Sequence, residues 1–331
     1  MPSSAHTGLP SNDLQRFARK SSPGEVFVRD WYEDSPQTHA VTLGWPRSHA
    51  FYTLRSGATS PLLLVETVRQ ALAVLSHTAQ EIPLDHRLGW DSAHYTFAPA
   101  AFREREAPAD VELRVRHSDV TRRRRPGSVR LTAHIEATCG GEDLGSAEIR
   151  YVTYPPAIYD RLRKEYADAQ QAFAAALPPA RPVTPAVVDR TDPADVVIAC
   201  TSKPHHYQLR TDTSNSVLFD HPHDHVPGVA LLEAVVQAVH ASARGHAQLA
   251  SLDTTFLRYV EFDAPCWVDV APESPDELGC SRLLVTGTQN GREAFSTTVT
   301  FDSPTTSLEP TAPADLPRLG AGPTPATCPA R

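Results

Sequence analysis

The chain has 331 residues, of which 40% are hydrophobic and 21% charged, so it holds enough apolar material for a folded core. Its net charge of −8 argues against a general nucleic-acid-binding protein, and no apolar run approaches the roughly eighteen residues of a membrane span. The N-terminal segment lacks the apolar stretch of a secretory signal, and the scattered cysteines form no C-x-x-C pair. We therefore expect a cytoplasmic protein that contacts neither nucleic acid nor membrane.

In chain order, the polar residues 1–22 are predicted to be disordered. Strands are predicted at 26–31 and 39–45, followed by a loop at 45–55 and a long apolar helix at 61–79. Four strand candidates follow the helix, at 89–97, 111–117, 129–138 and 146–154.

An Ala-, Lys-, Glu- and Gln-rich segment at 158–177 is predicted to be helical, and the proline-rich residues 178–186 to be a linker. The second half repeats the first: two strands, a polar loop, an apolar helix and four further strands. Its strand candidates are 196–200, 206–211, 254–260, 266–270, 282–289 and 294–301. Asn290-Gly291 between the last two strands predicts a tight hairpin, and the Pro/Thr/Ala-rich residues 304–331 are predicted to be disordered.

The two apolar helices are copies of one sequence. Residues 60–75 align without a gap with residues 227–242, and this offset of 167 residues pairs Glu66 with Glu233. Two copies indicate a duplicated domain rather than a solenoid, which needs at least three repeats.

A long helix packed on one curved antiparallel sheet is the hotdog arrangement. We therefore expect an α+β fold in which two hotdog repeats form a pseudo-dimer. The predicted boundaries are 23–156 for the first repeat, 187–303 for the second, and 157–186 for a connecting helix and linker.

Each apolar helix contains one carboxylate. Glu66 and Glu233 must be paired, neutral or catalytic, and Gln70 and Gln237 lie four residues later on the same helix faces. A buried polar network that holds the helices together would explain this pattern. A general base or acid whose pKa is raised by apolar surroundings would explain it too, and the duplication favours this catalytic interpretation.

A histidine-rich loop precedes the second helix. His221, His223 and His225 form an H-P-H-D-H run, one residue shorter than the H-x-H-x-D-H pattern of metal hydrolases, so we expect hydrogen bonding to substrate rather than a metal site. Pro227-Gly228 then begins the helix, and a thioester carbonyl could approach the N–H groups there. A simple turn is the alternative interpretation of Pro227-Gly228.

Basic residues mark two further places. Arg69 follows Glu66 by one turn, whereas the matching position of the second helix is Val236. Residues 122–125 are four arginines in a predicted turn, either a solvated hairpin or a docking patch for an acidic carrier protein. No phosphate-binding glycine loop, G-x-S-x-G or G-x-G-x-x-G motif occurs, which argues against NTPases, α/β-hydrolases and Rossmann enzymes.

Two segments carry a resemblance to a known family. The second, FDHPHDHVPGVALLEAVVQA at 219–238, and the first, WPRSHAFYTL at 45–54 with SPLLLVETVRQALAVLSH at 60–77, resemble the two hotdog repeats of the A-factor biosynthesis (AfsA-type) proteins. The resemblance covers about residues 25–303. A wider similarity links them to β-hydroxyacyl-carrier-protein dehydratases, whose loop histidine and Pro-Gly…Glu helix are comparable.

The family resemblance implies an acyltransferase without a metal or redox cofactor. A β-ketoacyl group would move from acyl carrier protein to the hydroxyl of dihydroxyacetone phosphate, on the way to a γ-butyrolactone, butenolide or furan signal. The candidate catalytic residues are Glu66 and Glu233. The candidate substrate-binding residues are Arg69, Gln70, His221, His225, Gly228 and Gln237.

One position departs from the family pattern. An arginine often follows the second glutamate by three residues, where this chain has Val236, so Arg69 is left as the expected phosphate contact. Two other interpretations stay open: a dehydratase or thioesterase on the same fold, and a non-catalytic module that binds acyl carrier protein.

Overall fold

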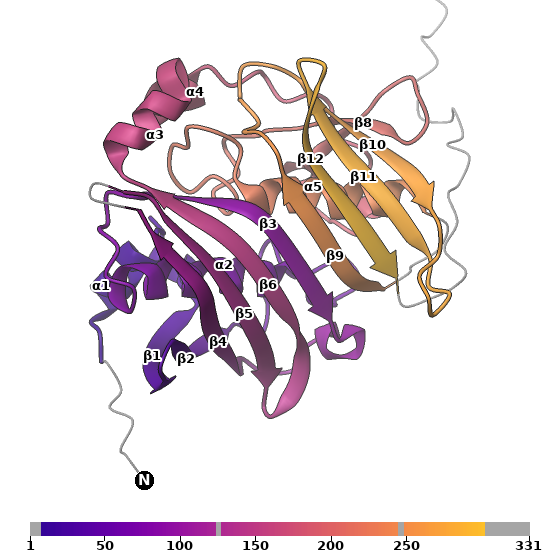
Figure 1. The fold of residues 1–331 in the computed structure, drawn as a ribbon. Helices are drawn as coiled ribbons and strands as arrows, with labels where there is room; N and C mark the ends of the chain where they lie inside the picture. Colours follow the sequence, from indigo (N-terminus) through magenta and orange to yellow (C-terminus); the bar gives the residue numbers. More distant parts are fainter. Residues whose placement is uncertain (1–7, 124–126, 244–247, 302–331) are drawn as a thin grey trace, which may run out of the picture.

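The computed structural model describes residues 8–123, 127–243 and 248–301, and their strands form one antiparallel sheet (Figure 1). In the first half the strands are β1 (Val28–Ser35), β2 (Thr38–Trp45), β3 (Arg87–Phe97), β4 (Ala109–Arg122), β5 (Val129–Cys139) and β6 (Glu142–Tyr154). In the second half they are β7 (Ile198–Cys200), β8 (His206–Leu209), β9 (Leu249–Phe256), β10 (Cys266–Glu273), β11 (Arg282–Gln289) and β12 (Arg292–Phe301).

The two halves have the same strand order. The sheet runs β1-β2-β4-β5-β6-β3 and continues as β9-β12-β11-β10-β8-β7. Strands β7 to β12 correspond in chain order to β1 to β6, so the second half has the order of the first, read from the opposite edge of the sheet. The halves join where β3 pairs with β9, with Ser92 opposite Thr255 and Thr96 opposite Ser251. An antiparallel pair at the join is what a pseudo-two-fold axis between equivalent units requires.

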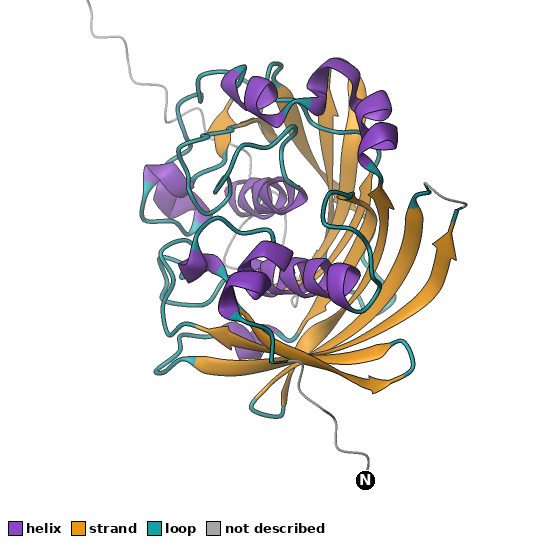
Figure 2. Ribbon diagram, turned by 90° about the vertical axis from the view of Figure 1, so that its left-hand side faces the viewer, coloured by secondary structure: helices purple, strands orange, loops and turns teal. Residues whose placement is uncertain are grey.

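Two long helices lie against the concave side of this sheet. They are α2 (Leu62–Thr78) and α5 (Gly228–Ser242), and nearly all their side chains are buried. Figure 2 shows the sheet curving around both helices, with loops and short helices on the opposite side. The double-hotdog α+β fold expected from the sequence is thus confirmed. Among the described residues, no helix has the length and apolar character needed to cross a bilayer.

The N-terminal segment differs from its predicted disorder. Residues 1–7 lie outside the described part of the chain, but α1 (Ser11–Phe17) is a helix beside α2. Leu14 and Ala18, four residues apart, bury their side chains in the core. Two apolar positions among polar residues gave too weak a signal in the sequence, and their tertiary contacts order the segment.

The connector is not one helix. It consists of α3 (Pro156–Arg163), a 3₁₀ turn and α4 (Ala169–Ala174), and the break falls at Lys164, whose φ is 52°. Asp168 caps α4 by accepting hydrogen bonds from two backbone N–H groups. The 3₁₀ helices in the described part of the chain are Pro23–Glu25, Pro99–Phe102, Lys164–Ala167, Pro185–Val188 and Pro193–Asp195.

Local signals succeeded in one turn and failed in one strand. Asn290 and Gly291 both have positive φ and join β11 to β12, which confirms the predicted hairpin. The strand predicted at 254–260 begins and ends earlier, as β9 (Leu249–Phe256). The chain leaves the sheet after Phe256, and the Val260 carbonyl accepts a hydrogen bond from the Val226 N–H in the histidine loop. The predicted tail at 304–331 lies outside the described residues.

Candidate active site

A cavity of about 420 Å³ lies between the two repeats. The first repeat contributes Glu66 and Arg69 from α2, and the second contributes the histidine loop and the start of α5. Of the residues expected at the site, the cavity is lined by Glu66, Arg69, His221, His225 and Gly228. Gln70, Glu233 and Gln237 do not line it.

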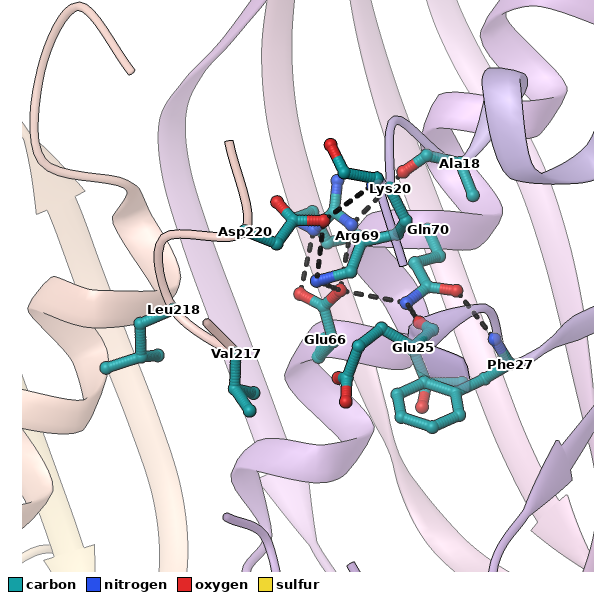
Figure 3. A network of polar contacts seen from close by, with 12 residues as sticks. Ala18, Lys20, Glu25, Phe27, Glu66, Arg69, Gln70, Val217, Leu218 and Asp220 are labelled. Carbon is teal, nitrogen blue, oxygen red and sulfur yellow. Dashed lines mark hydrogen bonds and ion pairs between the residues drawn. The ribbon is translucent and has the colours of Figure 1, made fainter. Parts of the chain in front are cut away.

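Glu66 is the centre of a polar network drawn in Figure 3. Arg69 donates to both carboxylate oxygens, at 2.8 Å each, and Gln70 donates to Oε1 at 2.9 Å. The Lys20 ammonium lies 3.6 Å from Oε1 and 3.8 Å from the carboxylate of Asp220, which belongs to the second repeat. The site is therefore assembled from both halves of the chain.

The network decides the charge of Glu66, which is only 4% exposed. Desolvation by itself would raise the pKa, but Arg69, Lys20 and Gln70 outweigh it and hold the pKa of Glu66 at about 2. The expectation that burial raises this pKa towards neutrality is thus wrong for Glu66. A carboxylate held in this state is a weak proton acceptor at neutral pH.

The loop histidines form two His–Asp pairs. The Nδ1 of His221 lies 2.6 Å from Oδ1 of Asp220, and that of His225 lies 3.1 Å from Oδ1 of Asp224. Since an ionised carboxylate can only accept, Nδ1 donates in each pair, and Nε2 is left to act on a ligand. Burial lowers the pKa of His223 to about 3, so this ring is uncharged at neutral pH.

The connector holds this loop in place. Arg163, whose side chain is 3% exposed, donates to Asp224 at 3.0 Å and to both oxygens of Glu261 at 2.7 Å. The Tyr159 hydroxyl donates to Asp224 at 2.6 Å. Desolvation would raise the pKa of Asp224, but His225 first, and then Tyr159 and Arg163, outweigh it and keep this pKa low, so the partner of His225 stays charged and fixed.

Three side chains of this loop, all in the described part of the chain, carry atoms of the kind that bind metal ions. Possible ligand atoms of Asp220, His221 and His223 all lie within 4.8 Å of one another. However, Asp220 already accepts from the Ser21 N–H at 2.7 Å and faces Lys20. The absence of a metal requirement stays a prediction from the sequence.

The remaining walls suit an acyl thioester. The N–H groups of Gly228 and Val229, the first two of α5, have no partner inside the helix and lie where its dipole is positive. A Cβ at Gly228 would stand 3.7 Å from the Phe256 ring and 3.8 Å from Trp90, so the helix start adjoins an apolar wall. Tyr52 also lines the cavity, and burial together with Glu66 raises its pKa well above 10, so its hydroxyl stays a donor.

The second glutamate, Glu233, does not line the cavity. Glu233 is fully buried, and the Arg190 guanidinium lies 2.5 Å from its Oε1 and also donates to the Phe51 carbonyl of the first repeat. The Arg190 guanidinium also stacks over the Phe51 ring at 4.5 Å. A loop of the first repeat therefore closes over this carboxylate, whereas the loop over Glu66 brings histidines and leaves a cavity.

Arg190 and Lys20 are equivalent residues that the sequence interpretation missed. The segment Lys20-Ser-Ser-Pro-Gly-Glu-Val26 matches Arg190-Thr-Asp-Pro-Ala-Asp-Val196 at an offset of 170 residues, and each contains a 3₁₀ helix. This second duplicated motif was the available signal. It supplies a cation to each glutamate, so Arg190 takes the place of the arginine absent at Val236.

The two glutamines have structural contacts of the same kind. Gln70 accepts from the Phe27 N–H and donates to the Glu25 carbonyl, and its amide also reaches Glu66. Gln237 likewise accepts from one backbone N–H, donates to one carbonyl and donates to Glu233 at 2.6 Å. Both amides are thus fully occupied within the protein.

Comparison with known proteins agrees with this duplicated arrangement. A family model described as the A-factor biosynthesis hotdog domain matches residues 14–155 and 170–303. A 2-oxo-3-(phosphooxy)propyl 3-oxoalkanoate synthase of Streptomyces virginiae is 35% identical over 291 residues, which cover 87% of this chain and 97% of that protein. A protein of the same name from Streptomyces coelicolor is 30% identical over 284 residues, with 83% and 87% covered.

Among solved structures, an acyl-ACP thioesterase from Bacteroides thetaiotaomicron resembles the chain with a TM-score of 0.47 and 12% identity. The similarity covers 80% of this chain and 98% of the thioesterase. The 12:0-ACP thioesterase from Umbellularia californica has a TM-score of 0.46 and 11% identity, covering 79% and 93%. Family membership depends on the sequence matches rather than on these distant similarities.

Proposed function

The chain belongs to the A-factor biosynthesis hotdog family, and on this premise we propose that it is an acyltransferase. It transfers a β-ketoacyl group from acyl carrier protein to the hydroxyl of dihydroxyacetone phosphate, for a γ-butyrolactone-type signal made in the cytoplasm. One observation carries the proposal: a single cavity collects an ionised carboxylate with its arginine, two His–Asp pairs and a helix N-terminus.

The reaction needs a proton acceptor beside the attacking hydroxyl. The hydroxyl oxygen bonds to the thioester carbon, the carbon–sulfur bond breaks, and the hydroxyl proton ends on the departing sulfur. We assign this proton transfer to His225, because this residue lines the cavity and the contact of its Nδ1 with Asp224 leaves Nε2 available to accept a proton. Glu66 then acts by charge, holding Arg69 and Lys20 in place rather than accepting the proton.

The tetrahedral intermediate carries a negative oxygen. The N–H groups at the start of α5, beginning with Gly228, and the hydroxyl of Tyr52 are donors on the same cavity. Donors already in place for a developing oxyanion commonly contribute more than any other single effect to acyl transfer. The wall around Trp90 and Phe256 provides apolar surface for the acyl chain.

A turnover experiment separates the candidate functions. The protein is given a β-ketoacyl carrier-protein thioester with and without dihydroxyacetone phosphate, and thiol release and the phosphorylated ester are measured. We expect both only when the triose phosphate is present. Thiol release without it would indicate a thioesterase, loss of water from a 3-hydroxyacyl thioester would indicate a dehydratase, and binding without turnover would indicate a carrier-binding module.

A variant links the activity to the assigned histidine. His225→Gln keeps a polar side chain but removes the imidazole ring, and we expect a loss of about 10²–10⁴-fold in kcat. His94, which lies half-exposed on β3 away from the cavity lining, gives a matched control, His94→Gln. Near wild-type turnover by His225→Gln would reject this assignment while leaving the reaction itself intact.

A further inference from the structure

The charges on the cavity wall are not balanced. The carboxylates that line it each have a cationic or histidine partner: Glu66 with Arg69 and Lys20, Asp91 with Arg130, Asp220 with Lys20 and His221, and Asp224 with Arg163. Arg19 and Arg87 line the same cavity. Among the described residues, no carboxylate lies within 4.0 Å of either guanidinium, so their charges are left for a ligand.

Arg19 is half-buried and held only by neutral groups. Its guanidinium donates to the Leu84 carbonyl at 3.1 Å, to the His86 carbonyl, and to Nε2 of His77 at 3.2–3.3 Å. His77 places its Nδ1 2.8 Å from the Ile82 carbonyl, so Nδ1 carries the proton and Nε2 accepts. The arginine is therefore fixed in position without being neutralised.

Further positive charge surrounds Arg19. Burial, Arg87 and Arg69 together lower the pKa of Arg19 to about 10, although Asp85 acts in the opposite direction. Arg87 is exposed at the start of β3, and Arg69 is already committed to Glu66. Withdrawing a cation from water without a counter-charge is costly, and a bound anion removes that cost.

We propose that Arg19 and Arg87 form a subsite for the phosphate group of a phosphate ester at the cavity wall, next to the Glu66–Arg69 pair. Guanidinium groups bind phosphate oxygens through short, charge-assisted hydrogen bonds, and the carbonyl contacts of Arg19 hold it ready for this. The ligand chemistry is shared by two sources, the triose phosphate and the phosphopantetheine arm of a carrier protein. The subsite deepens the acyltransferase assignment and rests on it.

The test compares two arginines that differ in position. Arg87→Gln removes one cation of the subsite, and Arg116→Gln removes an exposed arginine on β4 that does not line the cavity. Acyl donors are a β-ketoacyl N-acetylcysteamine thioester, which has no phosphate, and the same acyl group on carrier protein. Since a hydrogen bond to a charged group is lost, we expect Arg87→Gln to raise the KM for dihydroxyacetone phosphate on the order of tenfold with both donors. We expect kcat and the Arg116→Gln control to stay near wild type.

The outcomes distinguish the two phosphate sources. A raised KM for carrier-bound donor alone would keep the phosphate subsite but assign it to the phosphopantetheine arm. Unchanged KM values for every substrate would overturn the subsite while wild-type turnover still supports the acyltransferase.

Binding of inorganic phosphate gives a test that needs no turnover. Titration calorimetry is run on wild type, Arg87→Gln and Arg19→Gln, after thermal melting has confirmed that each is folded. We expect binding by wild type that weakens on the order of tenfold in Arg87→Gln. Equal binding by wild type and Arg87→Gln would reject the subsite even if the protein proved to have another activity. Because Arg87 is exposed, its substitution avoids the folding risk of replacing Arg19.

Discussion

Replacing each of the two equivalent glutamates by glutamine should affect mainly stability at Glu233 and mainly activity at Glu66. Glu233→Gln removes the anion from an ion pair whose side chains are 3% and 0% exposed, which leaves Arg190 buried without a counter-charge. Breaking a buried pair in this way costs about 3–5 kcal/mol of folding free energy. Glu66→Gln should cost less, because the Arg69 side chain is 24% exposed and Lys20 still faces Asp220. We expect roughly 1–3 kcal/mol there, the cost of an incompletely satisfied charged group.

Activity should follow the reverse order. Without the Glu66 carboxylate, Arg69 and Lys20 lose the group that positions them on the cavity, and a misplacement of about 1 Å can reduce turnover ~100-fold. Glu233→Gln, assayed at a temperature where it remains folded, should keep more than about half of wild-type kcat, because Glu233 does not line the cavity.

Urea unfolding and steady-state acyl transfer on both variants measure the two effects. Each variant serves as the other's control, because the chemical change is identical. A Glu233→Gln protein with wild-type stability and a ~100-fold loss of turnover would refute the division of roles. Equal losses of activity in both variants would show that two sites work together.

Three further outcomes are expected. Incubation with a chelator should leave turnover unchanged, and stoichiometric zinc lost together with activity would contradict this. Because the pKa of Glu66 is lowered from 4.5 to about 2, its stabilising contribution is complete above pH 4.5 and is lost as the pH falls towards 2. The difference in unfolding free energy between wild type and Glu66→Gln should therefore shrink across that interval, and a difference that vanishes near pH 6 would be inconsistent with it. Gly228→Pro removes one N–H at a helix position that tolerates proline, and we expect it to lower kcat by ~10²–10³-fold. Gly228→Ala keeps the N–H and should have a kcat near that of wild type. Equal kcat values for the two variants would contradict an oxyanion role of this N–H.

Much of the fold could be predicted because its signals are local. The duplicated helix around Glu66 and Glu233, the two-residue alternation of the strands and the Asn290-Gly291 turn each depend on neighbouring residues. The connector failed for the opposite reason. Composition favoured one helix across 158–177, but Arg163 turns inward to bind Asp224 and Glu261, which are far away in the sequence.

Several residues that line the cavity were expected from the sequence, but their arrangement was not. The sequence identified Glu66, Arg69 and the histidines separately, yet the helix pairing gave no means to tell which glutamate would face the histidines. Which glutamate lies near the histidines depends on which repeat each loop contacts, and such tertiary contacts cannot be read from the two helix sequences. The charge of Glu66 depends on Lys20, which lies 46 residues away in a segment expected to be disordered.

Duplication within one chain allows the two equivalent glutamates to take the different roles that we propose for them. In a dimer of identical subunits, every substitution appears at both sites, so a change that closes one site closes the other. Two repeats in one chain remove that constraint. Here Asp220 of the second repeat approaches Lys20 beside Glu66, whereas the Phe51 carbonyl of the first repeat accepts from Arg190 beside Glu233. The contact beside Glu66 leaves polar groups on a cavity, whereas the contact beside Glu233 buries the Arg190–Glu233 ion pair and connects the two repeats.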